Sequence, residues 1–274
     1  MPDVTPTKPG WHLFSRAHGF ELIFALLGSL ILLQVVAPLL GMFVTGTLSG
    51  LSAAAVDAEV TRSIRLSLGA ALAATLFCAV AGIPLSYLLA RHDFRGRSVV
   101  LALIDLPIVV PHTAAGIALL SVVGRQSWLG HFTGGLVGTY AGIALAMAFV
   151  SLPYLLNAAR EGFTAVPVRL EQVARTLGAS PSRVFFTISL PLAWRSILSG
   201  MILMWARGIS EFGAVVIIAY YPMTAPVLIY QRFNDYGLAY ARSAAQLLLL
   251  VCILIFVALR LVARTRKEPG ERHA

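Results

Sequence analysis

Six stretches of this chain are long and apolar enough to cross a lipid bilayer, which takes about 20 mostly apolar residues. They cover Phe20–Val44, Leu66–Ala90, Val99–Val123, Leu136–Leu156, Leu192–Tyr220 and Ser243–Val262. The chain is 58% hydrophobic and only 12% charged, whereas about a quarter of a soluble domain is charged. The pattern predicts an all-α, polytopic membrane protein with six transmembrane helices at 20–263, an N-terminal tail at 1–19 and a C-terminal tail at 264–274.

The distribution of Lys and Arg predicts how these helices are oriented. Fifteen of these residues lie in the two tails and in the loops Arg91–Arg97 and Asn157–Arg195, and only five lie in the other three loops. Because basic residues concentrate on the cytoplasmic side, both termini are expected in the cytoplasm of a multi-pass protein of the cell (inner) membrane. The formal net charge of +9 has the same cause and does not indicate a nucleic-acid partner.

The sequence contains no pattern typical of catalysis or cofactor binding. Cys78 and Cys252 lie inside apolar runs, where a thiol more often serves packing, and no Cys/His spacing typical of a metal site occurs. There is no G-x4-G-K-[ST], H-E-x-x-H or G-x-S-x-G motif. We therefore expect no cofactor, no metal and no enzymatic activity in this chain.

The segment from Pro167 to Pro191 is polar where its neighbours are apolar. Its pattern predicts two short helices, the first ended by a left-handed cap at Gly178 and the second begun by Ser180-Pro181 and ended at Leu190-Pro191. One stripe of the first helix is apolar by its three-and-four spacing and consists of Leu170, Val173, Ala174 and Leu177. Its polar residues face the other way and are Arg169, Glu171, Gln172, Arg175 and Thr176.

This segment resembles the cytoplasmic loop motif of ATP-binding-cassette (ABC) importer permeases, written E-A-A-x3-G-x9-I-x-L-P. Here the motif begins Gln172-Val173-Ala174, with Gln172 in place of Glu and Val173 in place of Ala, and an acidic residue, Glu171, stands one position earlier. In that family the loop, here 157–191, forms coupling helices that dock on a separate ATPase subunit. The resemblance implies this coupling role for Glu171, Gln172, Ala174, Arg175, Gly178, Ala179, Ile188, Leu190 and Pro191. The alternative is an amphipathic hairpin on the membrane surface.

The same resemblance implies the type I ABC importer permease fold and a set of partners. These are two copies of an ABC ATPase subunit, a second and identical permease copy, an extracytoplasmic substrate-binding protein and the lipid bilayer. Six spans give one chain too few walls for a pore, which agrees with a homodimer. The outward loop Thr45–Arg65 is too short for a folded domain, so we expect another chain to capture the solute.

The third stretch is the least regular of the six. Pro107 and Pro111 each remove a backbone donor and clash with the preceding turn, so we expect the helix to kink or unwind there. Asp105 and His112 bracket this break. The run D-L-P-x-V-x-P-H-T-x-A-G resembles the third span of molybdate and tungstate permeases, and the alternative is a packing kink with Asp105 at the lipid–water boundary.

The fifth stretch holds the two charges that are costliest to place in a membrane. Arg207 and Glu211 lie near its centre, where each isolated charge costs about 2.5–3.5 kcal/mol. Four residues apart on a helix, they share a face and can pair, while Gly208 and Gly213 allow another helix to approach closely. Two readings remain open: a structural ion pair, or a face that lines the translocation path.

The run A-R-x-x-x-E-F-G-A resembles the fifth span of oxyanion permeases, in which this span and the kinked third span flank the pore. The resemblance therefore implies a pathway or gate at Thr113, Arg207, Ser210, Glu211 and Phe212. An ionised Glu211 facing the pore would repel a dianion, so we expect it to be paired with Arg207 or protonated. Thr113 or Phe212 would then narrow the path.

The tyrosine-rich outward segment that begins at Tyr220-Tyr221-Pro222 looks closer to molybdate/tungstate permeases than to sulfate permeases, and the resemblance makes it a contact for the binding protein. We therefore expect the permease subunit of an ABC importer for an oxyanion substrate, molybdate or tungstate, driven by ATP hydrolysis on a separate subunit. Sulfate import by the same machinery is one alternative. A stand-alone secondary carrier, with Arg207, Glu211 and Asp105 as an ion relay, is the other.

Overall fold

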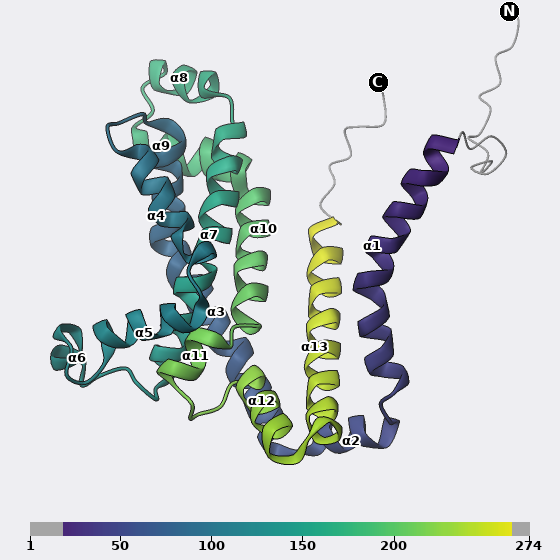
Figure 1. The fold of residues 1–274 in the computed structure, drawn as a ribbon. Helices are drawn as coiled ribbons and strands as arrows, with labels where there is room; N and C mark the ends of the chain where they lie inside the picture. Colours follow the sequence, from purple (N-terminus) through teal and green to yellow (C-terminus); the bar gives the residue numbers. More distant parts are fainter. Residues whose placement is uncertain (1–18, 265–274) are drawn as a thin grey trace, which may run out of the picture. The chain divides into compact units, whose positions relative to one another are not determined.

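The computed structural model describes residues 19–264, in which every regular element is helical (Figure 1). The chain divides into two compact units after Thr47, and the first contains α1 (Gly19–Val44). The second unit contains α2 (Leu48–Val56), α3 (Ala58–Arg91), α4 (Arg97–Val109), α5 (His112–Val123), α6 (Trp128–Thr133), α7 (Tyr140–Ala165), α8 (Val168–Thr176), α9 (Pro181–Val184), the π-helix η1 (Phe185–Ser189), α10 (Leu190–Ile209), α11 (Gly213–Ile218), α12 (Ala225–Tyr236) and α13 (Leu238–Arg264). The predicted tails at 1–19 and 264–274 lie almost entirely outside the described residues.

The helices confirm the predicted all-α membrane fold. Between residues 19 and 264, five helical segments are long and apolar enough to cross a membrane: α1, α3, α7, the run Pro181–Ile209 and α13. A sixth span exists if α4 and α5 are taken together, but these two helices meet at a bend of 115°. The predicted break in the third span is therefore confirmed.

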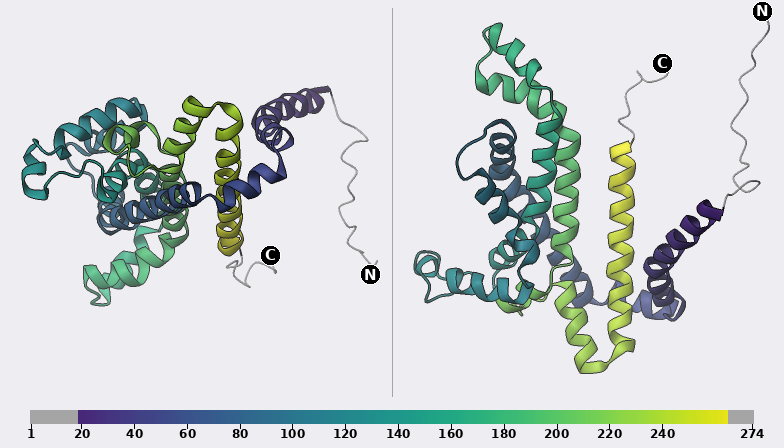
Figure 2. Two further views of the ribbon diagram at one scale, coloured as in Figure 1. Left: turned by 90° about the horizontal axis from the view of Figure 1, so that it is seen from below. Right: turned by 45° about the horizontal axis from the view of Figure 1, so that its top comes forward.

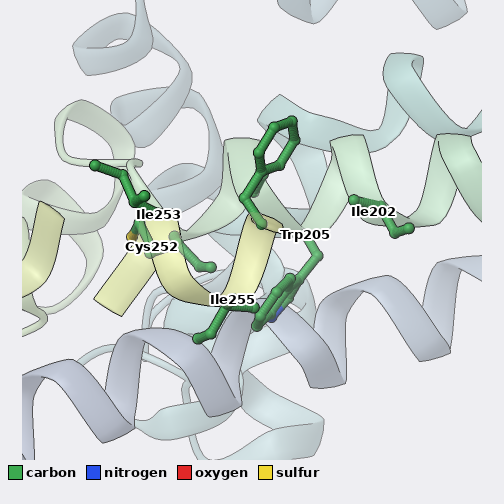
Figure 3. A pocket seen from close by; sticks show the side chains of 8 residues that line it. Ile202, Trp205, Cys252, Ile253 and Ile255 are labelled. Atoms are coloured by element: carbon green, nitrogen blue, oxygen red, sulfur yellow. The ribbon is translucent and has the colours of Figure 1, made fainter. Parts of the chain in front are cut away.

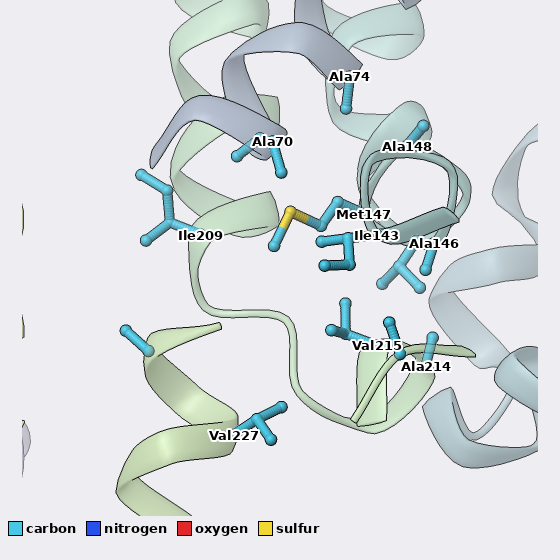
Figure 4. Close-up of a cluster of buried hydrophobic side chains, with 14 of the residues drawn as sticks. Ala70, Ala74, Ile143, Ala146, Met147, Ala148, Ile209, Ala214, Val215 and Val227 are labelled. Atoms are coloured by element: carbon cyan, nitrogen blue, oxygen red, sulfur yellow. The ribbon is translucent and has the colours of Figure 1, made fainter. Parts of the chain in front are cut away.

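The core of the second unit is built from α3, α7 and α10, which pack side by side (Figure 1). Small residues bring these helices close together, as small residues do in membrane proteins; a Cβ atom added at Gly200 of α10 would lie 2.8 Å from Ala158 of α7. Met147 of α7 is fully buried and points between Ala70 of α3 and Ile209 of α10 (Figure 4).

Two helix boundaries differ from the sequence prediction. The loop predicted at 157–191 begins later, because α7 continues to Ala165. The second short helix does not end at Leu190-Pro191: α9, η1 and α10 form one continuous helical run. The widened π turn explains the continuity, since the Leu190 N–H donates to the Phe185 carbonyl and the looser turn accommodates Pro191, which has no N–H of its own.

Two further breaks interrupt the third and fifth predicted spans. The third breaks at Val110-Pro111, and α4 passes through Pro107 without interruption, so only the second proline stands at the break. The fifth ends as a helix at Ile209 and resumes at Gly213. The prediction of one continuous helix from Leu192 to Tyr220 is therefore wrong.

At the start of α3, Arg232 of α12 pairs with two carboxylates. Its Nη2 lies 2.7 Å from Asp57 Oδ2 and 2.9 Å from Glu59 Oε2. Burial raises the pKa of Asp57, but hydrogen bonds from Arg232 and from two backbone N–H groups outweigh it, so the net pKa is lowered. Asp57 also caps α3, accepting from the N–H groups of Glu59 and Val60. This cluster attaches α12 to the start of α3.

An apolar pocket of about 280 Å³ lies between α10 and α13 (Figure 3). Its lining consists of Ile202, Trp205, Ala206, Ile209, Cys252, Ile253, Ile255 and Phe256. Such a lining offers no group that could hold an anion.

Candidate functional site

The polar segment after α7 folds as the short helix α8, which ends as the sequence predicts. Gly178 has a positive φ of 85°, its N–H donates to the Arg175 carbonyl, and the Ala179 N–H donates to the Ala174 carbonyl. These two bonds form the Schellman motif that closes a helix on a left-handed residue. Ser180 then caps α9, its Oγ accepting from the Arg183 N–H at 3.3 Å.

Glu171 of α8 is buried, although the other polar residues of this helix are exposed. Its Oε1 accepts from Arg91 Nε at 2.8 Å and from Ser189 Oγ at 2.8 Å, and its Oε2 accepts from Tyr87 Oη at 3.2 Å. Burial raises the pKa of Glu171, but these hydrogen bonds and the Arg91 charge outweigh it, so the net pKa is lowered. The ionised carboxylate therefore holds α8 against the end of α3 and the start of α10.

An amphipathic helix ordinarily packs its apolar stripe against the protein, and α8 does the reverse. With Glu171 2% exposed, the stripe faces outward: Leu170 is 45%, Val173 49% and Leu177 82% exposed. Exposed aliphatic side chains on a polar segment are typical of a surface that another protein covers. We call Leu170, Val173 and Leu177 the α8 face.

The other residues implied for coupling differ in how far they are exposed. Gln172, Arg175, Gly178 and Pro191 are exposed. Ala174, Ala179, Ile188 and Leu190 are half-buried. Sequence reasoning missed the partners of Glu171, namely Tyr87, Arg91 and Ser189; the available signal was Arg91 at the end of a predicted span, the position from which a long side chain can reach a neighbouring loop.

A second candidate site forms where the two broken spans meet. Gly213, the first residue of α11, packs directly on the start of α5: a Cβ atom added there would lie 2.8 Å from His112 Cβ and 3.2 Å from the Thr113 nitrogen. Gly208 of α10 packs similarly on Ala71 of α3, at 3.2 Å. Both glycines thus serve the close approach that the sequence predicted.

Arg207, Glu211 and His112 form a cluster at this meeting point. Arg207 Nη2 lies 3.0 Å from Glu211 Oε2, and His112 Nδ1 lies 3.2 Å from the same oxygen. The predicted pairing of Arg207 with Glu211 is confirmed, but through the break after α10 and not along one helix. The second carboxylate oxygen, Oε1, accepts the Ala214 N–H at 3.0 Å, which fixes the carboxylate on the first turn of α11.

Of the remaining predicted residues, Ser210 contacts this cluster and Asp105 lies apart from it. Thr113 and Ser210 are exposed, and Ser210 Oγ accepts from Arg207 Nη1 at 3.3 Å. Phe212 packs on Tyr230 with ring centroids 4.9 Å apart. Asp105 is separate: it lies inside α4 and accepts from Asn157 Nδ2 at 2.7 Å.

His112 was not among the pathway residues that the resemblance implied, although it is the residue that joins the two broken spans. The available signal was a histidine directly after the proline that breaks an apolar stretch. Within residues 19–264, no group of His, Cys, Asp or Glu is arranged to hold a metal ion.

Comparisons with known proteins give a consistent picture. Residues 82–267 match the family described as "Binding-protein-dependent transport system inner membrane component". The chain is 47% identical to the molybdate/tungstate transport system permease protein of Pyrococcus abyssi, over 87% of this chain and 93% of that protein. It is 32% identical to a probable sulfate transport system permease protein of Chlorokybus atmophyticus, over 72% of each chain.

A similar fold is found in the crystal structure of a bacterial ABC transporter involved in the import of the acidic polysaccharide alginate. The TM-score is 0.69 with 15% sequence identity, and the match covers 91% of this chain and 96% of that one. The match therefore concerns the fold, which is that of a type I ABC importer permease.

Proposed function

Because this chain belongs to the family of inner-membrane components of binding-protein-dependent transport systems, we propose that it is the membrane-spanning subunit of an ABC importer for molybdate or tungstate. It carries no ATP-hydrolysing site in this proposal. ATP is hydrolysed by a separate subunit, and the present chain forms the path through the membrane.

The observation that carries this proposal is the outward-facing α8 face. Leu170, Val173 and Leu177 are exposed on a helix that the buried Glu171 holds in place. A rigid, polar-flanked apolar surface of this kind suits docking into a groove on another protein. We propose that each of two ATPase subunits receives the α8 face of one permease copy, on the cytoplasmic side together with both termini.

The helix α10 connects the two candidate sites. Ser189, which bonds Glu171, directly precedes α10, and α10 ends two residues after Arg207. This 20-residue helix is about 30 Å long. Figure 2 shows α8 beyond one end of α10 and α11 beyond the other. We propose that displacement of α8 by the ATPase moves α10 and thereby opens or closes the cluster of Arg207, Glu211 and His112.

We further propose that two identical copies of this chain enclose the path and that a binding protein outside the membrane delivers the substrate. The residues proposed to face the path are Thr113, Arg207, Ser210 and Phe212, with Glu211 buried behind them. The substrate assignment follows the relatives named for molybdate/tungstate, which match more of this chain at higher identity than those named for sulfate.

The test is reconstitution of the chain into proteoliposomes with its ATPase and binding protein, and measurement of molybdate, tungstate and sulfate uptake. The proposal predicts uptake of molybdate and tungstate that requires ATP and the ATPase subunit. Uptake by the chain alone would favour a secondary carrier, and a clear preference for sulfate would replace the substrate while leaving the coupling proposal in place.

A further inference from the structure

We propose that the exposed edge of the Arg207 guanidinium is a contact for the tetrahedral oxyanion inside the translocation path, and that Glu211 and His112 are positioning residues that hold it there. This inference rests on the proposed function and specifies which atoms of the path meet the substrate.

The three side chains of the cluster differ in how far they are exposed. The Glu211 side chain is 1% exposed, whereas that of Arg207 is 22% and that of His112 37% exposed. The carboxylate, which would repel an anion, is therefore covered, and the cationic side chain reaches the surface. A path lined in this way presents hydrogen-bond donors to a passing dianion although the ion pair as a whole is neutral.

The Arg207 guanidinium contacts the ring of His112. Arg207 Nη2 lies 3.0 Å from Nδ1 and 3.1 Å from Nε2 of the ring. An atom nearly equidistant from both ring nitrogens at this range cannot lie in the ring plane, because it would collide with the carbon between them. Nη2 therefore lies over the face of the imidazole ring, a contact that suits the planar guanidinium group and helps to hold it in place.

These contacts leave part of the Arg207 guanidinium free. Arginine has five N–H donors; here Nη2 meets Glu211 and His112, and Nη1 donates to Ser210. Among the described residues no partner is recorded for Nε. Free guanidinium N–H groups bind oxyanions well because their planar geometry matches pairs of oxygen atoms.

The start of α5 also lies at this cluster, because His112 is its first residue. Pro111 precedes this 12-residue helix, and within the described residues no side chain caps it. The N-terminus of a helix carries roughly half a positive charge and free N–H groups, and it favours anions. Thr113, in the first turn of this helix, is exposed, while the Ser210 hydroxyl donates to the Arg207 carbonyl at 3.0 Å. Guanidinium, helix terminus and the Thr113 hydroxyl together match an oxyanion, which accepts hydrogen bonds on all four oxygen atoms.

The test measures protection of an introduced thiol in the complete transporter in proteoliposomes. The two native cysteines are replaced (Cys78→Ser, Cys252→Ser) and a probe is introduced with Thr113→Cys, directly after His112 in the first turn of α5. Reaction with a negatively charged thiosulfonate reagent is followed by mass spectrometry during ATP turnover. We expect molybdate to slow this reaction at least tenfold compared with chloride at equal ionic strength. Ser52→Cys, an exposed hydroxyl position on α2, is the matched control and should react at the same rate in both salts.

Variants of the cluster separate contact from mere structure. Arg207→Gln should abolish the protection by molybdate. His112→Ala should also abolish it, whereas His112→Phe, which keeps a flat ring under the guanidinium, should retain it within about threefold. A structural role alone would not distinguish these two variants by their response to molybdate.

The inference fails if the thiol at position 113 reacts equally fast with and without molybdate in a preparation that accumulates molybdate. If that preparation accumulates no oxyanion at all, the proposed function fails as well, so the two failures are distinguishable. If the Thr113→Cys chain does not assemble, Ser210→Cys, at the side chain that meets Arg207 Nη1, is judged by the same criterion.

Discussion

Replacing Glu171 with glutamine should release α8 from the rest of the protein. The carboxylate lies 2.8 Å from each of Arg91 Nε, Arg91 Nη2 and Ser189 Oγ, and the side chains of Glu171 and Arg91 are both largely buried. Glutamine keeps the shape but leaves the Arg91 guanidinium without its counter-ion. Removing one partner of a buried ion pair costs about 3–5 kcal/mol.

That cost should appear mainly as local opening of α8, since Arg91 regains water when α8 detaches. With a factor of ten for every 1.4 kcal/mol, exchange of the α8 amides should accelerate roughly 10²- to 10⁴-fold. Hydrogen exchange with mass spectrometry on the protein in nanodiscs measures this, and peptides from α7 serve as the internal reference.

Two further variants sharpen this experiment. Gln172→Ala changes an exposed neighbour and should leave exchange unchanged. Arg91→Met combined with Glu171→Leu removes both charges and should recover much of the protection, because no buried charge remains unpaired. If Glu171→Gln leaves the exchange of α8 as it is in the parent protein, the anchoring role of Glu171 is refuted.

Two other substitutions test the local structure. Gly178→Val places a side chain in the left-handed conformation at φ 85°, which costs about 1–2 kcal/mol, so the last turn of α8 should exchange faster; Gly178→Asn should be milder, and equal effects would contradict the explanation. Asp57→Asn keeps the cap of α3 but removes the charge that faces Arg232, so it should lower the melting temperature at pH 7 by at most about 2–4 °C. Because the folded pKa of Asp57 is lowered from 3.8, its contribution is present above that pH and is lost as the pH falls through the lowered value; a variant equally destabilised near pH 2 would exclude the charge as the cause.

Much of the fold could be predicted because the length of an apolar stretch and the residues of a helix cap depend only on neighbouring positions in the sequence. The spans, the cap at Gly178 and the cap at Ser180 belong to this class. The start of α10 could not be predicted in the same way. Pro191 normally indicates a helix boundary, but the π turn at Phe185–Ser189 carries the helix through it.

The candidate sites were predicted only in part, because their geometry depends on residues far apart in the sequence. The burial of Glu171 depends on Arg91, 80 residues away, and on Tyr87. Likewise, the pairing of Arg207 with Glu211 followed from their spacing, but the addition of His112 depends on two breaks that face each other across α5 and α11. Spacing within one helix contains no information about such contacts.

The most direct test of the account asks whether the α8 face attaches an ATPase that drives transport. Leu177→Asp places a charge on its most exposed member, and Leu48→Asp, at an equally exposed position on α2, is the control. Copies of the ATPase bound per purified permease and ATP-driven molybdate accumulation in proteoliposomes are measured together. We expect Leu177→Asp to lose both while Leu48→Asp keeps both. Full attachment and full accumulation in the Leu177→Asp protein would contradict the account.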